Sequence, residues 1–403
     1  MKKVLVIISG GLPIPAIKGG AVETLIDSYI NANEDLKEYK FEVYSTYCDG
    51  IEKYQKEYKF CNFSYIKVNS ILYQIKRYLR AFMHKVLKLP VEFKFIHEIK
   101  KDIKKKHKNY DLIIVENNAS LVPSISKMFK GKVVLHLHND NVNNSIQDGI
   151  KIFKECRRIY TVSNYIKQRC LTCDSKSEKV VTLLNGINQE ELLSMKNDNN
   201  RNEIRRKYGI EDNDIVFVFT GRMCDDKGVK ELLIAFNRIC NIYKNVKLMI
   251  VGASFFSAQK KDRYVKGLIK IAEKNKDNII FTGYIKHSEI GMIYNSADVQ
   301  VVPSKFDDPC PLTVIEGMTM GLPQIVSNCG GIPEEVTEEN AIFVERENLI
   351  DNLENAIKRI IENKDLRIEM SKKSIERAKL FSLELYNNNF FKLLRDEFNE
   401  NEE

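Results

Sequence analysis

The chain has 403 residues, 43% of them hydrophobic, and a formal net charge of +8. This length is two or three times that of a typical domain, so we expect two globular domains. The nine cysteines are scattered, which argues against a disulfide scaffold and favours a reducing cytoplasm. No apolar run approaches the roughly 20 residues of a membrane span, which argues against a transmembrane protein. The opening "MKKVLVIISGG" predicts a strand, because its apolar run is too short for a signal peptide.

The predicted strands alternate with helix-length segments along the whole chain. In the first half we expect them at residues 4–9, 41–46, 62–68, 111–117, 132–138, 158–163 and 179–184. A polar stretch over 185–203 interrupts the pattern, and a second series follows at 214–221, 246–252, 278–283, 298–304, 323–328 and 341–345. This is an α/β pattern of two Rossmann-like, doubly wound domains, 1–190 and 191–381, facing a central cleft at the carboxyl ends of their strands.

A glycine-rich loop follows the first predicted strand. In "SGGLPIPAIKGGAVETL", Gly10, Gly11, Gly19 and Gly20 precede a helix expected from Ala21. Such a loop can approach a phosphate closely and present backbone amides to it. The spacing is neither that of a dinucleotide fingerprint nor that of a P-loop. The alternative is a turn that only permits tight strand-to-helix packing.

Positive charge is concentrated in residues 67–108, which hold 13 Lys and Arg against 3 Asp and Glu. Within this segment, residues 73–89 have the pattern of a basic amphipathic helix. It is either a solvated surface helix or a contact with an anionic membrane or a lipid-linked acceptor. No aromatic-interleaved motif accompanies the charge, so we expect no nucleic-acid partner.

Two cations follow the first strand of the second half. "FTGRMCDDKGV" places Arg222 and Lys227 in a strand-to-helix loop, where they can neutralise a diphosphate. The alternative for Lys227 is a surface ion pair with Asp225 or Asp226.

Two acids lie eight positions apart in "SKFDDPCPLTVIEGMTMGLP". Pro309 and Pro311 place Asp308 in a loop, and we expect Glu316 in the first turn of a helix that begins near Leu312 or Thr313. Carboxylates can bind vicinal hydroxyls, and a diphosphate can bind the free amides between them, which belong to Leu312, Thr313 and Val314. Together these groups suit a nucleotide-sugar. The alternative makes Asp308 a loop cap and Glu316 a partner of the helix dipole.

These motifs, with "ADVQVVPSKFDDPCPLTVIEGMTMGLPQIVSNCGGIPEEV", resemble glycosyltransferase family 4, the retaining enzymes of GT-B fold. The resemblance covers nearly the full length and is strongest over 214–345. It implies that Glu316 binds the ribose hydroxyls and that residue 308 contacts the donor sugar. This chain has Asp308 where the family has Glu, and one methylene fewer shortens the reach by about 1.5 Å.

The same resemblance assigns further roles. Arg222 and Lys227 would bind the donor diphosphate, with the Gly19–Gly20 loop approaching it from the other domain. His138 would contact the transferred sugar, whereas His136 is expected to be buried in packing. Ser163 is predicted to cap a helix. The final helix, about 382–403, would return to the first domain.

The family likeness implies a front-face mechanism in which the leaving diphosphate helps to remove the acceptor proton. We expect a cytoplasmic hexosyltransferase that uses a UDP-sugar and a glycan or lipid-linked acceptor in surface polysaccharide synthesis. The inner face of the membrane is the alternative location. No cofactor or metal is expected, although acid pairs stand at 225–226 and 307–308. The alternatives are a catalytically silent nucleotide-sugar or glycan-binding relative, a GT-B epimerase, and a phosphorylase, for which no convincing cofactor lysine is present.

Overall fold

The computed structural model describes residues 1–8, 11–67, 99–101, 103–104, 109–253 and 263–399. Its contacts divide the chain into two compact units, Met1–Leu184 with Asn387–Glu403, and Asn185–Tyr386. The predicted basic helix over 73–89 and Gly10 lie outside the described residues. Within these residues, no helix combines the length and the apolarity that a membrane crossing requires.

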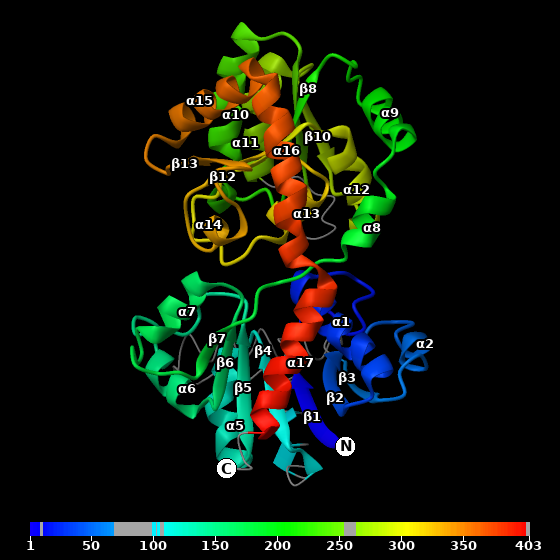
Figure 1. Ribbon diagram of the computed structural model, residues 1–403, viewed down its shortest axis with the longest axis vertical. Helices are drawn as coiled ribbons and strands as arrows, with labels where there is room; N and C mark the ends of the chain where they lie inside the picture. Colours follow the sequence, from blue (N-terminus) through cyan, green and yellow to red (C-terminus); the bar gives the residue numbers. More distant parts are fainter. Residues whose placement is uncertain (9–10, 68–98, 102, 105–108, 254–262, 400–403) are drawn as a thin grey trace. The chain divides into compact units, whose positions relative to one another are not determined.

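The first unit contains a parallel sheet with the strand order β3-β2-β1-β4-β5-β6-β7 (Figure 1). Its described strands are β1 (Lys2–Ile7), β2 (Tyr39–Thr46), β3 (Cys61–Ile66), β4 (Leu112–Glu116), β5 (Lys132–Leu137), β6 (Arg158–Thr161) and β7 (Val180–Thr182). The run Val4–Ile7 is completely buried, as is typical of a parallel strand covered by helices on both faces.

Helices of the first unit connect and cover these strands. They are α1 (Ala21–Leu36), α2 (Glu52–Gln55), η2 (Ala119–Leu121), α5 (Val122–Met128), α6 (Gly149–Glu155), α7 (Asn164–Leu171) and α17 (Leu383–Asn399). Helix α17 begins within the second unit and continues into the first. There it packs on α1, because Tyr29 stacks on Phe390 with ring centroids 4.0 Å apart. Arg158 Nε also donates to Glu397 Oε1 over 2.6 Å.

The second unit repeats the same topology with the strand order β10-β9-β8-β11-β12-β13. Its described strands are β8 (Ile215–Thr220), β9 (Val246–Val251), β10 (Ile279–Gly283), β11 (Val299–Val302), β12 (Gln324–Ser327) and β13 (Ala341–Val344). Its main apolar core lies between the sheet and three helices, α10 (Val229–Ile242), α11 (Arg263–Ala272) and α15 (Leu349–Glu362). The strands of both units match the thirteen predicted from the sequence, within the described part of the chain.

The remaining helical segments of the second unit are short to medium in length. They are α8 (Gln189–Ser194), α9 (Asp198–Lys207), η3 (Asp225–Lys227), α10 (Val229–Ile242), α11 (Arg263–Ala272), η4 (Glu273–Asn275), α12 (His287–Ser296), α13 (Leu312–Thr319), α14 (Ile332–Glu335), α15 (Leu349–Glu362), α16 (Lys364–Ala378) and η5 (Lys379–Phe381).

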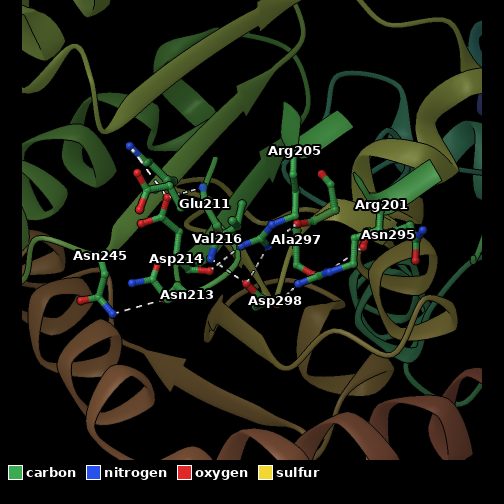
Figure 2. Close-up of polar contacts among 12 residues, drawn as sticks. Arg201, Arg205, Glu211, Asn213, Asp214, Val216, Asn245, Asn295, Ala297 and Asp298 are labelled. Atoms are coloured by element: carbon green, nitrogen blue, oxygen red, sulfur yellow. Dashed lines mark hydrogen bonds and ion pairs between the residues drawn. The ribbon is translucent and has the colours of Figure 1, made fainter. Parts of the chain in front are cut away.

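Two arginines of α9 fasten the start of the second unit to its sheet. Figure 2 shows Arg201 and Arg205 reaching the chain between α12 and β11, where Arg201 Nη2 lies 2.7 Å from Asp298 Oδ1. The guanidinium of Arg205, which is only 3% exposed, donates to the carbonyl of Ser296 over 3.1 Å and to that of Asp214 over 2.8 Å. Buried carbonyls that would otherwise lack partners are thereby satisfied.

Candidate functional site

The second unit has its topological switch point between β8 and β11, where connections leave in opposite directions. Ligands of open α/β sheets bind outside the carboxyl ends of the strands at such a point. Arg222 follows β8 and is exposed, and Lys227 lies in η3 of the same loop. Asp308 lies in the loop after β11, as predicted. The fold therefore brings both predicted cations and the first predicted acid to one edge of one sheet.

Lys227 forms an ion pair with Asp308. The alternative pairing of Lys227 with its sequence neighbours is wrong, because Asp225 binds Lys305 instead, with 2.9 Å between Oδ2 and Nζ. The Lys227 ammonium also lies 4.8 Å from the ring centroid of Phe306. An ammonium has three N–H donors, so Lys227 can hold Asp308 and still donate to a phosphate.

The backbone at Asp308 is fixed by a second loop. The amide of Gly331 donates to the Asp308 carbonyl over 2.8 Å. Gly330 has a φ of +58°, and a Cβ there would lie 2.4 Å from the same carbonyl oxygen. Only glycine permits this approach without displacement, so the "CGG" turn positions the acid.

Helix α13 begins at Leu312, as predicted, after Pro311 in an extended conformation. Not all of the three amides that were expected to be free are free. The Val314 amide donates to the Pro311 carbonyl over 2.9 Å, so its prediction as a free donor is wrong. Leu312 and Thr313 are half-buried at the helix start. Gln300 ties this helix to β11, because its Nε2 donates to the Thr313 carbonyl over 2.8 Å.

Glu316 is buried, and it is the fifth residue of α13. Its predicted place in the first turn is therefore wrong, and it is not a partner of the helix dipole. The Tyr294 hydroxyl donates to Glu316 Oε2 over 2.8 Å and lies 2.7 Å from Thr220 Oγ1 at the end of β8. His287 Nε2 lies 3.2 Å from Glu316 Oε1. Each carboxylate oxygen has one fixed partner and retains further lone pairs for ligand hydroxyls.

Sequence reasoning missed His287 and Tyr294. Both lie on α12, seven positions apart and so on the same helix face. A histidine four residues after the predicted strand 278–283 was an available signal. The hydrogen bond to Glu316 raises the pKa of His287, against the opposing effect of burial.

A second buried acid beside this site was also missed. Cys310 Sγ donates to Glu335 Oε1 over 3.1 Å, and Glu335 is 1% exposed. Burial raises the pKa of the Glu335 carboxyl well above its ordinary value, and Asp308 adds to this effect. The raised pKa favours the neutral form of this group more than in an ordinary glutamate, which reduces its repulsion toward an anionic ligand.

In the first unit, the glycine loop leads into α1 with Gly20 as the N-cap, as predicted. Gly19 and Gly20 have φ values of 69° and 109°. The Gly19 amide donates to the Ala16 carbonyl over 2.9 Å, so it is occupied within the loop. Glu23 lies against Gly20, and burial raises the pKa of its carboxyl.

His138 lies just beyond β5, and its ring is buried together with His136 and Glu116 from the ends of β5 and β4. His136 is completely buried, as predicted, but its contacts are polar as well as apolar. Its Nδ1 is 3.0 Å from Glu116 Oε2, and His138 Nε2 is 3.4 Å from the same oxygen. Glu116 was missed in the sequence analysis, although it lies next to the end of the predicted strand 111–117 and is the last residue of β4.

Protonation within this cluster follows from burial and from the mutual charges. Burial by itself would raise the pKa of Glu116, but His136 and His138 lower it to about 2. Burial lowers the pKa of His138 to about 4, and His136 contributes to the same shift. At neutral pH Glu116 is therefore a carboxylate and His138 a neutral imidazole.

Ser163 caps α7 as predicted. Its Oγ accepts from the amide of Ile166 over 3.4 Å. This contact gives Ser163 a structural role at the end of β6.

Residues 200–379 match the family model "Glycosyl transferases group 1". The chain is 28% identical over 375 residues to the putative glycosyltransferase YtcC of Bacillus subtilis, covering 90% of this chain and 84% of the relative. It is 25% identical over 229 residues to the lipopolysaccharide 1,2-N-acetylglucosaminetransferase of Salmonella typhimurium, covering 56% and 57%. The chain is thus similar to group 1 glycosyltransferases, over residues 200–379 for the family model and over most of its length for YtcC.

Among solved structures, the chain is similar to HepE of Anabaena in complex with UDP and glucose. The TM-score is 0.72 at 16% identity, and the match covers 98% of this chain and 99% of the other. The two parallel-sheet units thus have the GT-B fold, which confirms the fold predicted from the sequence.

Proposed function

We propose that this chain, whose relatives are glycosyltransferases and whose fold is GT-B, is a retaining hexosyltransferase that uses a UDP-sugar. The observation that carries this proposal is Glu316, a buried carboxylate held by Tyr294 and His287 at the switch point of the second unit. A fixed, buried carboxylate with free lone pairs suits the vicinal hydroxyls of a ribose. The HepE structure with UDP and glucose supports UDP as the nucleotide.

The donor diphosphate would be bound without a metal beside it. Arg222 and Lys227 would supply positive charge, and the start of α13, with Leu312 and Thr313, would supply the positive end of the helix dipole. Asp308 would contact the sugar while remaining paired with Lys227. The Gly19–Gly20 loop of the first unit is proposed as a phosphate-binding loop, and because its Gly19 amide is occupied, close backbone approach is its main contribution.

The proposed reaction is a front-face displacement. The acceptor oxygen forms a bond to the anomeric carbon as the bond from that carbon to the diphosphate oxygen breaks. The leaving diphosphate oxygen takes the acceptor proton, so no protein base is required. Arg222 and Lys227 stabilise the charge that develops on the diphosphate, and His138, as a neutral imidazole, would contact the transferred sugar.

The acceptor in this proposal is a glycan or a lipid-linked saccharide of surface polysaccharide synthesis. The similarity to a lipopolysaccharide N-acetylglucosaminetransferase supports this class. The basic segment 67–108 would hold the protein at the cytoplasmic face of an anionic membrane. Sedimentation of the full chain with phosphatidylglycerol vesicles, but not with phosphatidylcholine vesicles, is the expected result. Equal sedimentation with both would contradict it.

A panel of nucleotide-sugars tests the donor. We expect a UDP-sugar to raise the melting temperature through mass action, and UDP release to require a saccharide acceptor. Donor binding without turnover for any acceptor would favour a silent relative, and donor conversion without an acceptor would favour an epimerase. An unchanged melting temperature with every nucleotide-sugar would contradict the proposed site.

A further inference from the structure

We propose that Glu116, His136 and His138 form a binding site for a divalent cation of the zinc type in the first unit. The three residues offer one carboxylate oxygen and two imidazole nitrogens that all lie within 4.8 Å of one another. They come from the carboxyl ends of β4 and β5, next to the switch point of the first sheet. Two histidines and one carboxylate are a common ligand set for zinc.

The distances between the ligand atoms fit a shared cation. Zinc bonds of 2.0–2.2 Å in a tetrahedral arrangement place neighbouring ligand atoms about 3.3 Å apart. Glu116 Oε2 is 3.0 Å from His136 Nδ1 and 3.4 Å from His138 Nε2. Despite this proximity, none of these three atoms has an aligned hydrogen-bond partner in the described part of the chain. A cation shared by the three atoms would give each of them a partner.

Burial gives the site a need for positive charge. Glu116 and His136 are completely buried, and a buried carboxylate without a counter-charge is strongly unfavourable. A divalent cation would compensate Glu116 and take one nitrogen from each imidazole as a ligand.

A neighbouring residue already orients the carboxylate. The Tyr29 hydroxyl donates to Glu116 Oε1 over 3.2 Å, which leaves Oε2 for the cation. Hydrogen bonds of this kind to the second oxygen of a ligating carboxylate are usual at metal sites.

Three protein ligands leave a fourth coordination position open for water or for a sugar hydroxyl. The suggestion that a sugar hydroxyl occupies this position rests on the proposed function, whereas cation binding does not. Cation binding itself is measured without donor or acceptor, so the two proposals can fail separately.

Titration of the metal-free, tag-free full chain with Co²⁺ tests the site. We expect uptake of one equivalent with the visible absorption bands of four-coordinate Co²⁺, and displacement of the Co²⁺ by Zn²⁺. No saturable uptake by the wild-type chain would overturn the proposal, whatever the variants do. A thiolate-to-cobalt charge-transfer band would also overturn it, because it would place the ion on a cysteine.

Variants locate the ion. Glu116→Gln preserves the shape of the side chain and should weaken uptake at least about 100-fold, because even the loss of an outer-shell partner costs about 10- to 100-fold. Tyr29→Phe keeps all three ligands and should weaken uptake about 10-fold. His287→Gln, a histidine of the other unit, is the matched control and should bind Co²⁺ like the wild type. Unchanged uptake by a folded Glu116→Gln variant would contradict the proposal.

Discussion

The two sheets have the same strand order around their switch points but present different chemistry there. In the first unit, Glu116 ends β4 and lies buried against two imidazoles. In the second, Asp308 follows the equivalent strand β11 and pairs with Lys227, while Arg222 nearby is exposed. The shared topology therefore decides where a carboxylate is placed, and the local side chains decide what it can bind. A shielded histidine cluster suits a small cation, whereas an edge with exposed positive charge suits an anionic nucleotide.

Of the variants that test this difference between the two units, Glu316→Gln is expected to have the largest effect. Loss of a charged acceptor for two ribose hydroxyls should lower kcat/KM about 100- to 1000-fold, since hydrogen bonds to charged groups are worth about 1.5–3 kcal/mol each. Steady-state UDP release measures the change. Glu338→Gln, a change at an exposed glutamate, is the control. Near-normal turnover of a folded Glu316→Gln variant would contradict the assignment of Glu316 to the donor site.

A change outside both sites separates stability from binding in the second unit. Arg205→Ala removes the donor to the carbonyls of Ser296 and Asp214, while Asp298 keeps its contact with Arg201. Loss of a buried donor to these carbonyls should lower the free energy of unfolding by about 3 kcal/mol. Denaturant unfolding followed by circular dichroism measures this loss, with the exposed Arg206→Ala as the control. Donor affinity of the folded variant should be unchanged. A loss of stability no greater than that of Arg206→Ala would show that the contacts of Arg205 in Figure 2 do not stabilise the second unit.

Lys227→Met tests whether the carboxyl edge of the sheet in the second unit binds an anion. It removes one cation from the proposed diphosphate site and leaves Asp308 buried without its partner, so donor affinity should fall about 10- to 100-fold. Isothermal titration with UDP measures it. Lys305→Met is the matched control, because Lys305 is also ion-paired, with Asp225 and Glu231, but has no assigned role in binding. Equal effects of the two variants would contradict a specific role of Lys227.

The smallest expected effect concerns pH. The pKa of Glu335 is raised from an ordinary value of 4.5, so above that pH the unfolded state releases a proton that the folded state retains. This group therefore lowers stability as the pH rises from 4.5 toward its folded pKa. Glu335→Gln should be close to wild type at pH 4.5 and more stable by the order of 1 kcal/mol at pH 8. Unfolding curves at both pH values measure it, with Glu334→Gln as the control, and a pH-independent difference would refute the assignment.

Much of the fold and part of the site could be predicted because their signals are local in sequence. Continuous apolar runs identified the strands, and the prolines around Asp308 fixed the start of α13. Glu316 was assigned to the first turn of α13 but lies just beyond it, because it is the fifth residue of a helix that begins at Leu312. The occupied Val314 amide was missed for a related reason, since a tight first turn forms only once the preceding chain is folded.

The sequence by itself determined two doubly wound α/β units, the loop that carries Arg222 and Lys227, and the helix that carries Glu316, because apolar periodicity, glycine and proline act over a few residues. Only the tertiary structure decided that Lys227 pairs with Asp308, that His287 and Tyr294 hold Glu316, and that Glu116 meets His136 and His138. These partners lie between 20 and about 80 positions apart in the chain, and a parallel sheet brings them together only when its strands align. The pairing of charges in a buried site depends on that alignment, which cannot be predicted from any short stretch of sequence.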